Sequence, residues 1–161
     1  MGDFSHLSQE NEARMVHLGR KPDTERSALV KAHVKVSTDC AQKLSPEMAL
    51  EIARTARLSG IQAAKQTAML IPLCHQVPLK GVDVTITFDQ NAGVFEIKAS
   101  AHTFGATGVE MEAMCAASMA AVTVYDMVKG ADPEAVIHNI FLAEKKGGKK
   151  GHWLRSTQSP A

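Results

Sequence analysis

Residues 82–99 have the sequence VDVTITFDQNAGVFEIKA, in which two alternating stretches flank a short polar segment. Residues 82–88 alternate apolar Val, Ile and Phe with Asp and Thr, and residues 94–99 place Phe, Ile and Ala on one face. This alternation is typical of strands that bury one face and expose the other. The polar segment, residues 89–93, ends in a glycine, as many hairpin loops do. The sequence therefore predicts an antiparallel hairpin with one buried and one wetter face.

Two further strands and a long helical stretch are predicted around the hairpin. Residues 29–36, LVKAHVKV, place valines and alanine on one face, and residues 135–142 are a final strand candidate. Ser45, which is followed by a proline, is a predicted N-cap for a helix over residues 47–70. Good helix formers dominate that stretch, and Gly60 is its weak point. We therefore expect one long helix, or two helices that meet near Gly60.

A second helix is predicted over residues 109–129, closed by Gly130 as its C-cap. Its middle, MEAMCAASMAAV at residues 111–122, is almost entirely small residues and methionine. Small side chains let another element approach closely, and methionine fills irregular gaps. The elements together predict an α+β domain in which the helices pack on a mainly antiparallel sheet.

The composition is that of a single globular domain, with 161 residues of which 45% are hydrophobic and 22% charged. The net charge of +1 creates no global field, and an aromatic content of 4% argues against a nucleic-acid platform of stacked rings. No apolar run approaches the ~20 residues of a membrane span, and the polar N-terminus does not resemble a secretory signal. We expect a flexible arm at residues 1–13, one domain over residues 14–152 and a tail at residues 153–161.

The cysteines and histidines show no metal-binding pattern. Cys40, Cys74 and Cys115 are widely spaced and never form a CxxC pair. They indicate reduced thiols of a cytoplasmic protein rather than a disulfide or zinc framework. The seven histidines form no paired ligand spacing, and no metal site is expected. Phosphate-loop, dinucleotide-binding, zinc-protease and serine-hydrolase motifs are all absent.

Five polar residues are candidates for chemistry, and each also has an ordinary structural explanation. Glu110 and Glu112 fall in the first turn of the second helix, where carboxylates interact favourably with the helix end. Because they are two residues apart they point in different directions and form no dyad. Asp126 and Lys129, three residues apart, form either a surface ion pair or a tuned acid–base pair. His75 lies between two prolines, as a solvated imidazole or a proton-transfer group.

A basic segment follows the last predicted strand. Residues 145–151, KKGGKKG, offer four ammonium groups and flexible backbone N–H donors. Such a segment suits phosphate or pyrophosphate, although a solvated C-terminal segment has the same composition. From the residues alone, the chain is an α+β domain that suits a polyanionic small molecule.

Several segments, taken together, resemble the cyclic pyranopterin monophosphate synthase (MoaC) family of molybdenum cofactor biosynthesis. They occur in order and with compatible spacing over nearly the whole chain. The segments are MVHLGRK with TERSA within residues 15–28, TARLSGIQAAKQT at 55–67, LIPLCH at 70–75, TGVEMEAM at 107–114, AVTVYDMVK at 121–129 and EKKGGKKG at 144–151. LIPLCH, GVEMEA and YDM are the most specific of them.

The resemblance implies a fold, a reaction and an assembly. Family members are lyases that convert (8S)-3′,8-cyclo-7,8-dihydroguanosine 5′-triphosphate to cyclic pyranopterin monophosphate and release diphosphate. Their fold is a ferredoxin-like antiparallel sheet with long helices on one face. They assemble as hexamers, trimers of dimers, with active sites at subunit interfaces. The sequence requires no cofactor and leaves open whether Mg²⁺ accompanies the triphosphate; neither a nucleic acid nor a membrane is an expected partner.

The resemblance also carries site residues over to this chain. Asp126 and Lys129 match the catalytic aspartate and lysine. Substrate binding falls to the loop near residue 74, the start of the second helix and the basic segment. The residues are Leu73, Cys74, His75, Glu110, Met111, Glu112, Lys145 and Lys149. Proton shuttling suits the acid–base groups among these residues, and lysines suit the departing diphosphate.

The chain departs from the family pattern at two cationic positions. Most members have Lys-Gly-Asp where this chain has Ala49-Leu50-Glu51, and Gly-Lys-Thr-Gly where it has an alanine at position 106. Three lysines, Lys43, Lys146 and Lys150, are candidates to compensate for the lost charge. The alternative to an active synthase is a catalytically weak paralogue that binds a pterin or nucleotide, or that regulates a true synthase.

Overall fold

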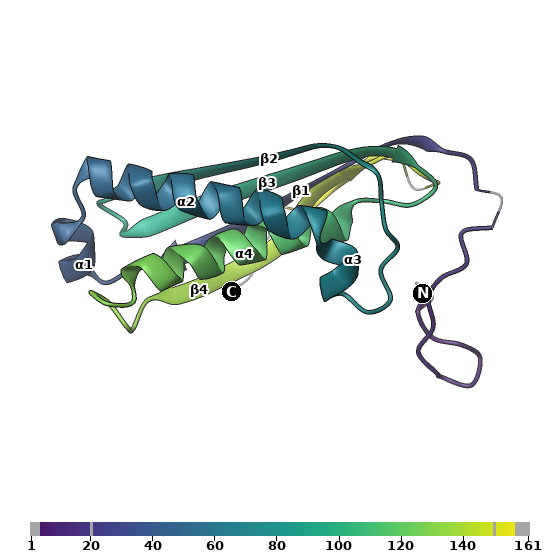
Figure 1. The fold of residues 1–161 in the computed structure, drawn as a ribbon, viewed down its shortest axis with the longest axis horizontal. Coiled ribbons are helices and arrows are strands. Elements are labelled where there is room, and N and C mark those ends of the chain that lie inside the picture. The colour runs from purple at the N-terminus through teal and green to yellow at the C-terminus, as the bar shows by residue number, and fades with distance from the viewer. Residues whose placement is uncertain (1–3, 20, 150, 157–161) are drawn as a thin grey trace.

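Five strands form one antiparallel sheet in the order β2–β3–β1–β4–β5, and helices α2 and α4 lie across one face of it (Figure 1). The computed structural model describes residues 4–19, 21–149 and 151–156. Along the chain the elements are β1 (Thr24–Lys35), α1 (Thr38–Lys43), α2 (Pro46–Lys65), α3 (Thr67–Leu70), β2 (Leu79–Asp89), β3 (Val94–Gly105), α4 (Glu110–Val128), β4 (Val136–Lys146) and β5 (Trp153–Leu154).

The order of connections is that of a ferredoxin-like fold. Helices α1 to α3 connect β1 to β2, a hairpin joins β2 to β3, and α4 connects β3 to β4. This β-α-β-β-α-β arrangement, with β1 and β3 at the centre of the sheet, defines the class. The predicted α+β, ferredoxin-like fold with long helices on one face is confirmed.

The predicted hairpin forms from β2 and β3, with the expected faces. Phe95 and Ile97 are fully buried beneath the helices, and Phe88 stacks on Phe95 with ring centroids 4.4 Å apart. Gly93, at the end of the loop, has a positive φ of 62°, which a glycine adopts without steric cost. Its carbonyl accepts a hydrogen bond from the backbone N–H of Val36. The loop is thereby tied to the strand that lies beside the hairpin.

Helix α2 begins where the sequence predicts but does not break at Gly60. The Ser45 side chain caps it by accepting a hydrogen bond from the N–H of Met48, and the proline occupies the first helical position. The helix continues through Gly60 to Lys65. Of the two alternatives, the single long helix through Gly60 is confirmed, although it ends at Lys65 and the short helix α3 follows; a break near Gly60 is wrong, because this glycine is where α2 packs against α4. A Cβ at Gly60 would lie 2.8 Å from the carbonyl oxygen of Ala116.

Helix α4 is the core helix of the domain. Its Ala113, Ala116, Ala117, Ala120 and Ala121 are fully buried, so the predicted close approach to a neighbouring element is confirmed. By length and composition alone α4 would also be long and apolar enough to cross a membrane. Here its small residues pack against α2 and the inner face of the sheet.

The end of α4 differs from the prediction. Lys129, in a right-handed helical conformation, is the C-cap, and Gly130 does not adopt a left-handed conformation. The N–H groups of Ala131 and Asp132 both donate to the carbonyl of Val128, so the chain closes the helix without a glycine turn. The Gly130 cap was therefore a wrong prediction.

The last predicted strand is longer than expected and takes up the start of the basic segment. Strand β4 runs to Lys146, so Lys145 and Lys146 belong to the sheet. The short strand β5 then pairs with β4. Lys150 lies outside the described residues.

Replacing Gly60 with Ala tests the contact between α2 and α4. The new methyl group would collide with a backbone carbonyl, and overpacking of this kind destabilises by about 1–3 kcal/mol. The better helix propensity of Ala offsets roughly 1 kcal/mol of that loss. We expect a lower free energy of unfolding in chemical denaturation, whereas Gly130→Ala, which meets nothing within 4 Å, should leave it nearly unchanged. A Gly60→Ala protein as stable as the parent would show that the two helices are not in close contact.

Candidate active site

A cavity of about 870 Å³ opens at the N-terminal end of α4. Its walls come from the α3–β2 loop, the β3–α4 turn, the first turn of α4, the end of β4 and the segment that precedes β1. All the predicted substrate-binding residues except Lys149 line it: Leu73, Cys74, His75, Glu110, Met111, Glu112 and Lys145. Lys149 lies in the loop after β4 and is exposed.

The loop that carries Leu73, Cys74 and His75 is fixed at both ends. At its start the N–H of Cys74 donates to the carbonyl of Ile71, which forms a turn after α3. At its end the Thr103 hydroxyl donates to the carbonyl of Pro78 at 2.8 Å. Two prolines, at positions 72 and 78, further restrict the backbone. The imidazole of His75 is therefore presented to the cavity from an anchored loop.

Glu110 forms an ion pair within the cavity wall. Its Oε1 lies 2.9 Å from the Nζ of Lys145, and about a third of each side chain is exposed. A Cβ at Gly108 would lie 1.9 Å from the Oε2 of Glu110, so a larger residue here would displace the carboxylate from its present position. Gly108 thus leaves room for the carboxylate that pairs with Lys145.

Glu112 has a different environment from Glu110. It is 3% exposed, and burial, together with the nearby charge of Glu110, raises the pKa of its carboxyl group. Burial first, and the charge of Glu112 second, also raise the pKa of the Cys74 thiol. Cys74 therefore stays protonated near neutral pH, which suits a binding contact rather than a nucleophile.

Arg26, on β1, supports the turn that leads into α4. Its guanidinium donates to the carbonyls of Gly105 and Ala106 at 2.9 and 3.1 Å. Ala106 is one of the two positions where the chain lacks a family lysine, and its backbone carbonyl accepts one of these hydrogen bonds. Sequence reasoning did not single out Arg26, because its partners lie far along the chain. Lys21 and His6, which also line the cavity, were missed for the same reason.

Asp126 and Lys129 lie at the opposite end of α4. Sixteen residues separate Glu110 from Asp126, which is about 24 Å along a helix that rises 1.5 Å per residue. The Asp126 carboxylate is 2.6 Å from the Lys129 ammonium, and both side chains are more than half exposed. The hydrogen bond to Asp126 and the negative charge of Asp126 both raise the pKa of Lys129. Within one chain, then, the predicted catalytic pair is not beside the predicted binding residues.

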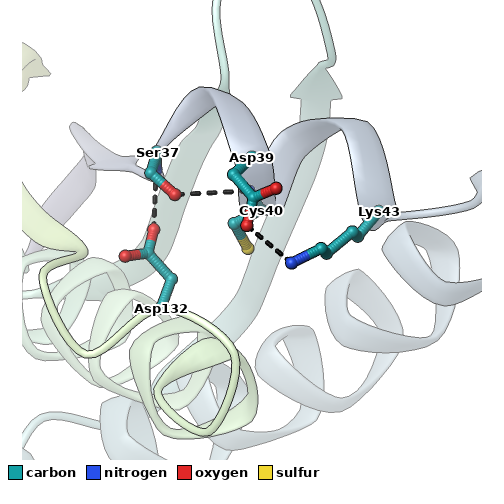
Figure 2. Close-up of polar contacts among 5 residues, drawn as sticks. All are labelled: Ser37, Asp39, Cys40, Lys43 and Asp132. Carbon is teal, nitrogen blue, oxygen red and sulfur yellow. Dashed lines mark hydrogen bonds and ion pairs between the residues drawn. The ribbon is translucent and has the colours of Figure 1, made fainter.

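A polar cluster lies just beyond this pair, at the end of the domain that α1 occupies (Figure 2). The buried Asp132 carboxylate accepts a 2.6 Å hydrogen bond from the N–H of Ser37, whose hydroxyl caps α1 through the N–H of Cys40. Lys43 is engaged by Asp39 at 2.6 Å. The cluster joins the end of α4 to the start of α1 and fixes the backbone that carries Lys129.

Two other predicted features concern cations. Ala49 is buried in the hydrophobic core on the second turn of α2, so its methyl group does not reach the surface. Lys146 is 3.0 Å from the carboxylate of Glu144 and does not line the cavity. Among residues 4–19, 21–149 and 151–156, no three His, Cys, Asp or Glu side chains are grouped to hold a metal ion.

Comparison with known proteins gives a consistent result. Residues 15–148 match the sequence model of the MoaC family. A cyclic pyranopterin monophosphate synthase of Geobacillus thermodenitrificans is 43% identical over 98% of this chain and 99% of its own length. Those of Heliobacterium modesticaldum and Bordetella avium are 42% and 45% identical, over 96% and 93% of this chain and 99% and 94% of their own lengths.

Replacing Glu112 with Gln tests the burial of its carboxyl group. A carboxyl whose pKa is raised on folding favours the folded state only while protonated, so its contribution is present at low pH and is lost as the pH rises above its ordinary value of 4.5. We expect Glu112→Gln to be more stable than the parent at pH 7 and no more stable at pH 4, by thermal unfolding. The exposed Glu134→Gln is the control. An equal effect of Glu112→Gln at both pH values would contradict the burial argument.

Proposed function

The chain belongs to the MoaC family, and from that premise we propose that it is a cyclic pyranopterin monophosphate synthase of molybdenum cofactor biosynthesis. It acts as a lyase that converts (8S)-3′,8-cyclo-7,8-dihydroguanosine 5′-triphosphate to cyclic pyranopterin monophosphate and diphosphate. One observation carries the proposal beyond the family: predicted binding residues from three separate segments line one cavity. Its size lies in the range of small-molecule sites, about 300–1,000 Å³.

The charges in the cavity suit this substrate. Lys145 and Lys21 both line the cavity. Their ammonium groups would bind a triphosphate, and positive charge there would stabilise the oxygens of the departing diphosphate. Opening the purine ring and closing the pyran ring require protons to be moved between ring atoms. Glu112, whose protonated form burial favours, and His75 are the groups in the cavity suited to that role. Any Mg²⁺ enters with the triphosphate as its counterion.

Asp126 and Lys129 enter the site from a second copy of the chain. The face of α4 between the cavity and this pair carries exposed apolar side chains, namely Met111, Met119 and Val122. A second α4, packed antiparallel on this face, would bring its own Asp126 and Lys129 to the cavity. The proposed enzyme is therefore a homo-oligomer with active sites at subunit interfaces, and we propose a hexamer built as a trimer of dimers.

Charge lost at Ala49 and Ala106 is the proposed cause of any reduced activity. Lys43 is the best placed of the compensating lysines, because α1 precedes α2 at the end of the domain that carries Ala49 and Lys129. It would have to release Asp39 to act. We propose a cytoplasmic location, consistent with the three free thiols, Cys40, Cys74 and Cys115.

Turnover by the purified protein tests the function directly. The substrate should be consumed with release of one diphosphate per cyclic pyranopterin monophosphate, measured by a coupled diphosphate assay and by product fluorescence after oxidation. Asp126→Asn keeps the shape of the side chain and removes the ionisable acid, so it should fold normally and lose about 10²–10⁴-fold in turnover. Binding of substrate without turnover by the parent protein would instead identify the weak paralogue.

Mixing two inactive variants tests the shared site. His75→Ala and Asp126→Asn each damage one half of every site in a uniform oligomer. When the two are dissociated, mixed and reassembled, some interfaces receive an intact half from each protomer, and turnover should recover to about a quarter of the parent value. Mass spectrometry would verify that mixed oligomers have formed. If such oligomers recover no turnover, both residues act in the site of a single protomer. Light scattering at micromolar concentration should show no monomer.

A further inference from the structure

Residues 152–155, which we call the C-terminal clasp, attach the end of the chain to β4 beside the cavity. Trp153 pairs with Lys145, and Leu154 pairs with Glu144. Arg155 adds two hydrogen bonds, from its backbone N–H to the carbonyl of Ala143 at 2.9 Å and from its Nε to the carbonyl of Leu142 at 2.8 Å. Its guanidinium also lies 5.0 Å from the ring centre of Phe141. The clasp thus contacts β4 over the residues that lead into the cavity.

Two adjacent lysines of β4 have opposite environments. Lys145 pairs across the sheet with the buried Ala28, so it lies on the helix side, where it meets Glu110. Lys146 pairs with Ser27 on the other face and contacts Glu144 instead. Because side chains alternate along a strand, a shift of β4 by one residue would place Lys146 or, in the other direction, Glu144 where Lys145 now lies. The register of β4 therefore decides which side chain enters the cavity.

The pairing of β4 with β1 is irregular at two places. Leu29 pairs with Glu144 whereas Val30 pairs with Leu142, so Ala143 is an extra residue in the ladder, and a second irregularity follows between Lys31 and His33. The clasp acts at this point. The backbone N–H of Arg155 donates to the carbonyl of the extra residue, Ala143. The Oε1 of Glu144 lies 2.7 Å from the Nε2 of His152 and 3.0 Å from the Nζ of Lys146. These contacts hold Glu144 and Lys146 on the face opposite the cavity.

We propose that the C-terminal clasp fixes the register of β4 and thereby positions Lys145 in the cavity, with Arg155 as the principal positioning residue. The register lock follows from the strand contacts alone, while its consequence for catalysis rests on the proposed synthase function. The two parts are tested by different measurements.

Hydrogen exchange tests the lock without any assay of function. A chain that ends after Gly151 lacks the clasp, and a chain that ends after Ser156 keeps it as a matched control. Arg155→Ala is a milder variant that removes the Nε hydrogen bond and the contact with Phe141. We expect faster exchange over residues 136–146 in the short chain and in Arg155→Ala, with α2 unchanged, and parent-like exchange in the control. Unchanged exchange over β4 in folded Arg155→Ala and in the short chain would overturn the lock.

Alanine variants of the two lysines test the positioning. In the parent protein, Lys145→Ala should raise KM about tenfold, because it removes one charge-assisted contact to a phosphate. Lys146→Ala should change KM less than twofold. In the Arg155→Ala background the effects of the two variants should become similar, because either lysine then reaches the cavity. If Lys145→Ala alone still matters, the clasp does not position it. If the parent protein turns over no substrate, the same variants are compared by their affinity for inorganic diphosphate, measured by calorimetry. This measurement separates failure of the proposed function from failure of the clasp.

Discussion

The contact between α2 and α4 is the constraint on which the rest of the domain depends. Helix α4 buries five alanines against its neighbours, and Gly60 lets the backbone of α2 lie against the carbonyl of Ala116. Larger side chains would lift one helix from the sheet. Because α4 is held along its length, both of its ends are fixed, and each end carries a polar group of functional interest. The small residues therefore determine the positions of residues that they do not touch.

Charge in this protein is arranged locally rather than globally. The chain is nearly neutral, yet the cavity places the Glu110–Lys145 ion pair beside the buried Glu112. The carboxylate of Glu110 forms an ion pair with an ammonium group, whereas burial raises the pKa of the Glu112 carboxyl group. Two glutamates two residues apart on one helix thus acquire different roles from their surroundings alone.

Local sequence patterns predicted the structural features that depend on residues close together in the chain. The alternation of β2 and β3 and the cap at Ser45 were read correctly because strand faces and helix starts are set within a few residues. Gly60 was interpreted as a weak point of the helix, because the contact that requires a glycine there is with Ala116 of α4, more than fifty residues away. Arg26 escaped notice for the same reason, since its carbonyl partners lie on the β3–α4 turn. His75, the two glutamates of α4 and the basic segment were candidates from the residues alone, and the family resemblance added Leu73, Cys74 and Met111. The structure adds that all the predicted binding residues except Lys149 line one cavity.

The length of α4 has a consequence for how catalysis and assembly are related. A lysine side chain extends about 6 Å from its Cα, whereas about 24 Å of helix separates Glu110 from Asp126. No side-chain rotation closes that distance, and bending α4 would break the alanine contacts that hold it on the sheet. If both groups act on one substrate, they must come from different chains. In the proposed oligomer, the packing that stabilises each protomer would therefore also leave a lone protomer without a complete active site.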